Sequence, residues 1–149
     1  MSHTFTSYSP EDTMSIASSL AAKLSGGEVI AMRGGLGMGK TCFITGLAKA
    51  LGFSGEVTSP TFAIVNEYIG GRLNLFHFDA YRITGWDDLY STGYFEYLDA
   101  GGVVAVEWSE NIQGALIGEN VITVEIERLS ENERKITITG GVKYENTCN

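Results

Sequence analysis

The chain has 149 residues, of which 44% are hydrophobic and 11% aromatic, so it is long and apolar enough to bury a core. Its formal net charge is −8, from 10 Lys and Arg residues against 18 Asp and Glu residues, which argues against autonomous nucleic-acid binding. We expect a cytoplasmic protein without disulfides, because it has two distant cysteines, no visible secretory signal and no apolar run long enough to span a membrane.

The first third of the chain predicts a helix, a strand and a second helix. A helix is expected to start at Ser9, a typical N-cap residue, because Pro10 suits the first helical position and apolar residues then recur at helical spacing. Residues 28–32 are a short apolar run and predict a buried strand, and residues 42–51 again have helical periodicity. The segment between them therefore joins a strand to a helix.

That joining segment, Gly34–Thr41, matches the phosphate-binding loop pattern Gly-x-x-x-x-Gly-Lys-Thr in full. Glycines let successive backbone N–H groups point at phosphate oxygens, and the following helix adds its own N–H groups and the positive end of its dipole. Lys40 would supply a cation to the β- and γ-phosphates, and the Thr41 hydroxyl would ligate Mg²⁺. The predicted backbone cradle comprises Leu36, Gly37, Met38 and Gly39. The loop predicts binding of ATP or GTP with Mg²⁺.

The rest of the chain predicts further strands and one short helix. The expected elements are a hairpin of residues 62–69 and 73–78, a helix within 86–97, a buried strand at 103–108 and a hairpin of 121–128 and 135–139. Because no repeat or break in composition occurs, residues 1–141 are predicted to be a single domain and 142–149 a C-terminal tail. The predicted fold is α/β, a P-loop NTPase-like domain whose mixed, mostly parallel sheet is flanked by helices and ends in antiparallel strands.

Two acidic residues end predicted strands, where a P-loop protein needs a carboxylate. Asp79 follows residues 73–78, and Glu107 follows the apolar residues 103–106, which indicate a central strand. We assign Glu107 to Mg²⁺, directly or through a water, and Asp79 to water activation or support of the metal. The residues alone leave an exchange of these two roles open.

Other candidates have two interpretations each. The loop at residues 59–61 is compatible with a γ-phosphate sensor or an ordinary turn. Trp108 would cover the nucleotide or pack in the core, and Arg82 and Arg134 would reach a phosphate or form surface ion pairs. His77 is interpreted as a structural histidine.

Taken together, the motifs resemble the bacterial TsaE (YjeE) family, small ATPases needed to make threonylcarbamoyladenosine on tRNA. The resemblance runs nearly end to end and rests on Gly34–Thr41, Val57–Phe62, His77–Arg82, Asp88–Leu98 and Val106–Trp108. The chain departs from the family pattern at Gly35, Met38 and Cys42, where an acid, an alanine and often a threonine are usual. None of these departures changes the lysine, the metal-binding hydroxyl or either acid.

The resemblance implies ATP rather than GTP, slow hydrolysis, and partnership with a TsaB–TsaD pair that would itself hold the tRNA. It also implies that Thr41 and Glu107 bind Mg²⁺, that Ser9 lies near the nucleotide and that Arg134 reaches it. The family positions associated with turnover correspond to Thr61, Asp79 and Trp108.

Two other functional classes stay open from the residues alone. A small P-loop kinase usually needs an arginine-bearing lid, and the five arginines of this chain are not clustered. A non-hydrolysing nucleotide switch needs the same loop and metal as an ATPase, so the sequence does not separate the two. No Asn-Lys-x-Asp motif for reading guanine is present, which favours adenine.

Overall fold

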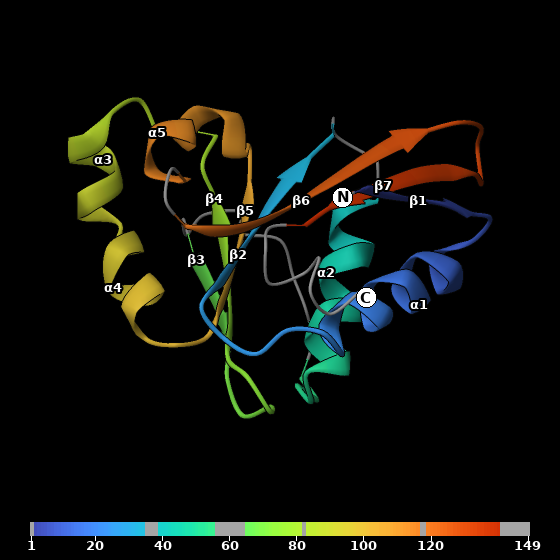
Figure 1. Cartoon of the computed structure of the whole chain (residues 1–149), viewed down its shortest axis with the longest axis horizontal. Helices are drawn as coiled ribbons and strands as arrows, with labels where there is room; N and C mark the ends of the chain where they lie inside the picture. The colour runs from blue at the N-terminus through green and yellow to red at the C-terminus, as the bar shows by residue number, and fades with distance from the viewer. Residues whose placement is uncertain (1, 35–38, 56–64, 82, 117–118, 141–149) are drawn as a thin grey trace.

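The computed structural model describes residues 2–34, 39–55, 65–81, 83–116 and 119–140. These residues form a seven-stranded sheet with the order β1-β7-β6-β2-β5-β4-β3 (Figure 1). Its strands are β1 (Ser2–Ser7), β2 (Glu28–Arg33), β3 (Val65–Tyr68), β4 (Leu75–Asp79), β5 (Val103–Glu107), β6 (Asn120–Arg128) and β7 (Arg134–Thr139). The four central strands β6, β2, β5 and β4 are parallel, and the outer pairings are antiparallel. The predicted α/β sheet with C-terminal antiparallel strands is confirmed.

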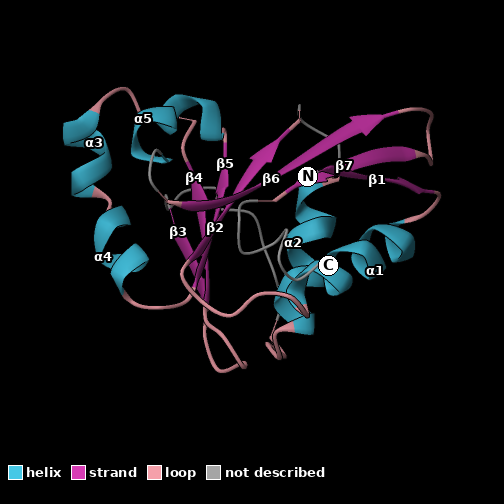
Figure 2. Ribbon diagram, in the orientation of Figure 1, coloured by secondary structure: helices cyan, strands magenta, loops and turns pink. Residues whose placement is uncertain are grey.

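Helices cover both faces of the sheet (Figure 2). The helical elements are α1 (Pro10–Ala21), α2 (Lys40–Ala50), α3 (Trp86–Ser91), α4 (Tyr94–Asp99), the 3₁₀ helix η1 (Ser109–Ile112) and α5 (Gln113–Leu116). Helices α1 and α2 pack in one buried cluster, and α3, α4, η1 and α5 contribute to the other. Figure 1 shows these two groups on opposite sides of the central strands.

Strand β5 shows why the central segments read as continuous apolar runs. Side chains alternate between the faces of a strand, so Val103 and Ala105 join the α1–α2 cluster while Val104 and Val106 join the other. Because both faces are covered, every position of the strand is buried. The same alternation turns Glu107, two residues after Ala105, towards the α1–α2 side.

Helix α2 packs closely against α1, and this contact positions α2 in the fold. A Cβ atom added at Gly46 would lie 2.7 Å from the Met14 carbonyl oxygen and 2.9 Å from the Ala17 Cβ. Any side chain at this position would force the two helices apart, so glycine permits the observed approach. The contact holds α2, and with it the end of the phosphate loop, against α1.

Three features differ from the predictions. Residues 2–7, for which no element was predicted, form the edge strand β1, which is antiparallel to β7 and pairs Ser2 with Thr139. The single helix expected within 86–97 is two helices, α3 and α4, separated at Gly93, whose φ of 82° is left-handed. Helices η1 and α5 after β5 were not predicted.

The predicted domain limit at residue 141 stays a prediction, because the tail of residues 142–149 lies outside the described residues. Among the helices of the described ranges, none combines the length and apolar character needed to cross a membrane. The four parallel strands end at one edge of the sheet, and the predicted site residues are found there.

Candidate functional site

The start of α2 is suited to an anion. Strand β2 ends at Arg33, the phosphate loop follows, and α2 begins at Lys40. Gly39 is its N-cap residue with a φ of 98°, a left-handed conformation that favours glycine, and it provides no side-chain hydrogen bond. The first turn of α2 carries no acidic residue. The positive end of this helix is therefore not offset by a cap or an acid of its own.

Lys40 lies between an acid and an aromatic ring. Its side chain is only 6% exposed, and its Nζ is 3.5 Å from the Oε1 of Glu107. The same Nζ is 5.1 Å from the centroid of the Trp108 ring, a cation–π distance. The predicted phosphate-binding lysine is thus brought directly to the predicted metal-binding carboxylate.

Glu107 has a second partner, His77, from the neighbouring strand β4. The Nε2 of His77 donates to the Oε2 of Glu107 at 2.8 Å, and His77 is fully buried. Burial, the largest single influence, raises the pKa of Glu107, but the hydrogen bond from His77 and the charge of Lys40 together hold that pKa below its ordinary value. Glu107 is therefore a buried carboxylate kept ionised by two partners.

Asp79 ends the adjacent strand in register with Glu107. Its Oδ1 accepts a hydrogen bond from the backbone N–H of Tyr81 at 2.9 Å, and its side chain is half-buried. The N–H of Ala80 donates to the backbone oxygen of Glu107 at 3.0 Å, which ties the two strand ends together. Both predicted acids thus lie at the same edge of the sheet.

Trp108 faces the site and is not simply core. Its φ of 59° and ψ of 40° are left-handed, an uncommon conformation for a non-glycine residue. Besides Lys40, its ring contacts Tyr81, with centroids 4.9 Å apart. Directly after it, the Ser109 hydroxyl donates to the Met32 oxygen at 3.3 Å, which anchors this turn to β2. Trp108 also packs, half-buried, against the cluster that α3, α4, η1 and α5 line, so its covering role stays a prediction.

Ser9 and Arg134 meet at a small cavity next to the phosphate loop. This cavity of about 110 Å³ is lined by Ser9, Gly39 and Arg134, with Thr13 and Cys42 among the other lining residues. The Ser9 hydroxyl caps α1 by accepting from the N–H of residue 12 at 3.1 Å, as predicted. The Nη1 of Arg134 donates to carbonyl oxygens of the β6–β7 turn, the nearest at 2.8 Å. Both residues therefore have structural partners and also face the space beside Gly39.

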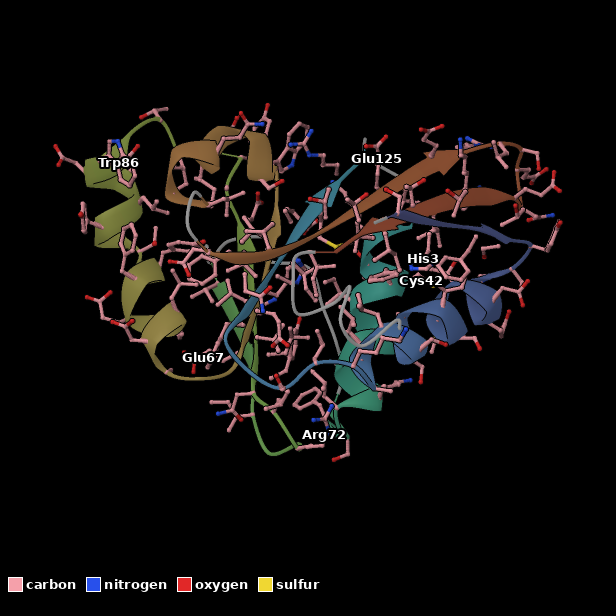
Figure 3. The ribbon with its side chains drawn as sticks, viewed as in Figure 1. His3, Cys42, Glu67, Arg72, Trp86 and Glu125 are labelled. Carbon is pink, nitrogen blue, oxygen red and sulfur yellow. The ribbon has the colours of Figure 1, made fainter. Side chains whose placement is uncertain are left out.

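Cys42 connects the starts of the two helices on this side. Its Sγ lies 3.6 Å from the carbonyl oxygen of Pro10, and burial raises the pKa of the thiol. Figure 3 shows Cys42 on α2, on the opposite side of the sheet from Trp86 on α3.

The described site residues divide into three groups. Lys40, Glu107, Trp108 and the unexpected His77 are in mutual contact through Glu107 and Lys40. Asp79 lies at the same sheet edge, and Ser9 with Arg134 lines the adjacent cavity. Gly39 and Thr41 flank Lys40 at the start of α2. The other predicted residues, Leu36, Gly37, Met38 and Thr61, and the candidate Arg82 lie outside the described residues.

His77, interpreted from the sequence as a structural histidine, is fully buried and hydrogen-bonded, and its partner is the predicted metal-binding residue Glu107. The available signal was its spacing: it precedes Asp79 by two residues on one strand, so the two side chains share a face.

The donors at the strand end fit Mg²⁺. No group of three His, Cys, Asp or Glu side chains that would hold a metal occurs among the described residues. Mg²⁺ does not need one, since it is usually bound through one or two carboxylates together with substrate phosphates. The Glu107 carboxylate and the exposed Thr41, next to Lys40 on α2, provide oxygens of the required kind.

Comparison with known proteins gives consistent results. The family model described as "Threonylcarbamoyl adenosine biosynthesis protein TsaE" matches residues 7–136. Two similar curated proteins are both described as tRNA threonylcarbamoyladenosine biosynthesis protein TsaE. That of Bacillus subtilis is 42% identical over 93% of this chain and 87% of its own. That of Treponema pallidum is 37% identical over 89% of this chain and 96% of its own.

A solved structure has the same fold. The crystal structure of Bacillus subtilis YdiB aligns with a TM-score of 0.82 and 36% sequence identity, covering 99% of this chain and 92% of that chain. The predicted P-loop NTPase fold is confirmed.

Proposed function

This chain belongs to the TsaE family of threonylcarbamoyl adenosine biosynthesis proteins, and we propose that it binds ATP with Mg²⁺ and hydrolyses it slowly. We further propose that it acts in the cytoplasm with a TsaB–TsaD-like complex in the threonylcarbamoyladenosine modification of tRNA. The observation that carries the ATPase proposal is the Lys40–Glu107 pair, 3.5 Å apart, at the start of α2. The pair joins a phosphate-binding cation to a metal-binding carboxylate.

Lys40 is proposed to change partners when the nucleotide binds. Phosphate oxygens carry more charge than one carboxylate and would draw the ammonium towards the β- and γ-phosphates. The Glu107 Oε1, which faces Lys40 at 3.5 Å, would then be released for the metal together with the Thr41 hydroxyl. Mg²⁺, when bound, would neutralise negative charge on the phosphate oxygens.

Turnover is proposed to use the neighbouring strand end and an aromatic cover. Asp79, in register with Glu107, would orient or activate the attacking water. Trp108, whose ring lies beside Lys40, and Tyr81, whose ring is 4.9 Å from that of Trp108, would limit access of bulk water. Ser9 and Arg134 would contact the nucleotide in the cavity beside Gly39.

The partner proposal follows from family membership and charge. With a net charge of −8, this chain is poorly suited to hold tRNA, so its partners would do so. The proposed division of work is that this protein binds and hydrolyses ATP while the partner complex carries the tRNA.

The test is calorimetry with ATP and with GTP, each with Mg²⁺, alone and with the TsaB–TsaD pair, together with phosphate release in the same mixtures. We expect selective ATP binding that changes when the pair is added, and slow phosphate release that requires Mg²⁺. Binding without any phosphate release in either mixture would favour a nucleotide switch. Transfer of the γ-phosphate to an added small acceptor would favour a kinase.

A further inference from the structure

We propose that His77 is a positioning residue that holds the Glu107 carboxylate in the orientation needed to bind Mg²⁺. The inference rests on the proposed function, because it assigns His77 a role at the same metal site. Three observations support it: the strand register, the different partners of the two Glu107 oxygens, and the burial of the imidazole.

The strand register brings His77 to Glu107. His77 pairs with Ala105 on β5, and Asp79 pairs with Glu107 two residues further on. Side chains two residues apart share a face of a strand, so His77, Asp79 and Glu107 all lie on the face that packs against α1 and α2. The imidazole therefore lies one step below the strand end, where it supports a carboxylate without itself reaching the edge.

The two oxygens of Glu107 have different partners. Oε2 accepts from the Nε2 of His77 at 2.8 Å, and Oε1 faces the Nζ of Lys40 at 3.5 Å. If Lys40 turns to phosphate, Oε1 loses that partner while Oε2 keeps the hydrogen bond. Because His77 is 0% exposed and packed on all sides, it holds Oε2 in place and leaves Oε1 directed at the phosphate side.

The hydrogen bonding of the imidazole is consistent with this role. A hydrogen bond to a carboxylate requires the proton on Nε2. The Nδ1 is buried and has no hydrogen-bond partner among the described residues, so the Nε2 side makes the polar contact. The hydrogen bond that the structure gives to this buried ring goes to the Glu107 carboxylate on the neighbouring strand β5.

Three substitutions separate positioning from packing. His77→Gln keeps a donor at the place of Nε2, because the glutamine amide nitrogen is as many bonds from Cβ as Nε2. His77→Asn carries the same amide one carbon short of Glu107, and His77→Leu has no donor. The matched control is Phe76→Leu, which removes buried aromatic volume from the same strand on the opposite face.

The experiment measures ATP affinity by calorimetry in EDTA and across a Mg²⁺ titration, with thermal unfolding of each variant. Loss of a group that orients a metal ligand typically costs about 10–100-fold in metal affinity. We expect that loss in Mg²⁺ affinity for His77→Leu and His77→Asn, with ATP affinity in EDTA changed less than about twofold. His77→Gln should recover most of the loss, and Phe76→Leu should lower only the unfolding temperature.

The outcomes distinguish this inference from the proposed function. If the ATP affinity of the wild type does not change with Mg²⁺, the proposed function is overturned and the inference with it. If the wild type depends on Mg²⁺ and His77→Asn depends on it equally, only the inference is overturned. If His77→Leu does not fold, the comparison of His77→Gln with His77→Asn decides, since both are amides, and equal Mg²⁺ affinity in the two would overturn the inference.

Discussion

The ends of β4 and β5 look alike in sequence but differ in structure. Each strand ends in a carboxylic acid, and Asp79 and Glu107 lie side by side in register. Glu107 is buried and bound by His77 and Lys40, whereas Asp79 is half-buried and accepts a hydrogen bond from the backbone of its own turn. Glu107 is thus held by side chains of the site, and Asp79 by the backbone of the turn that follows it.

This difference assigns separate work to the two acids. A carboxylate with a fixed orientation and a neighbouring cation is prepared to bind a metal, because little reorganisation is needed when the ligand arrives. A carboxylate nearer to solvent is better placed to exchange a proton with water. The asymmetry supports Glu107 as the metal ligand and Asp79 as the residue that acts on water, the roles proposed above.

The largest expected effect comes from removing the cation that faces Glu107. Lys40→Ala should abolish measurable ATP binding or weaken it roughly 30-fold to several thousand-fold, because losing one partner of a buried charge pair costs about 2–5 kcal/mol. Calorimetry with ATP and Mg²⁺ measures the loss. Lys49→Ala, at the exposed last turn of the same helix, is the matched control and should bind normally. Equal affinity in the two variants would remove Lys40 from the site.

The next prediction tests the two acids directly. Glu107→Gln should lower Mg²⁺ affinity by at least the roughly 10–100-fold expected for disturbing a metal ligand's partner, while ATP binding in EDTA persists. Asp79→Asn should keep its Mg²⁺ affinity and lose phosphate release by about 10²–10⁴-fold, the usual contribution of a general base. Mg²⁺ titration and phosphate release, measured on both variants, decide the matter. The reverse pattern would exchange the two roles.

The sequence predicted the strands and the loop because their signals are local. The apolar run 103–106 and the glycine-rich segment at 34–41 each carry their own pattern, so their types followed from neighbouring residues. Strand β1 was missed because most of its side chains are exposed and it is held by pairing with β7, at the other end of the chain. The break at Gly93 was missed because the aromatic periodicity continues across it.

The site was predictable in its members but not in its contacts. Lys40, Asp79 and Glu107 were named from motifs and strand ends, but the sequence did not show which acid faces the lysine. That choice depends on sheet register and on which face each side chain takes, and these are set by pairing between distant segments. The His77–Glu107 hydrogen bond spans 30 residues and became visible only once β4 and β5 were aligned.

A smaller effect should appear in how the stability of the folded protein depends on pH, through Glu107. Its folded pKa lies below its ordinary value of 4.5, so the ionised form stabilises the fold. This contribution is present above about pH 4.5 and is lost as the pH falls through the folded pKa, at about 1.4 kcal/mol per unit of pKa difference. Urea unfolding from pH 7 to 3 should therefore show a weaker loss of stability for Glu107→Gln than for the wild type.

The control for this measurement is Glu127→Gln, which removes a carboxylate exposed on β6. Its stability should follow the wild-type pH dependence. An unchanged pH dependence in Glu107→Gln would show that the His77 and Lys40 contacts do not favour the ionised form over the protonated one.

The smallest effect concerns the cation–π contact of the site, in which the Lys40 Nζ lies 5.1 Å from the centroid of the Trp108 ring. For a buried lysine such a contact contributes about 2 kcal/mol, so its loss changes affinity by roughly 30-fold at most, and the ring reports it optically. The chain has two tryptophans, and Trp86→Phe leaves Trp108 as the single emitter. If Lys40 moves from Glu107 to the phosphates, the emission of Trp86→Phe should change on ATP addition and that of Trp108→Phe should not. A response carried by Trp86 alone would mean that ATP acts at α3, on the other side of the sheet, and that the Lys40–Trp108 contact does not report nucleotide binding.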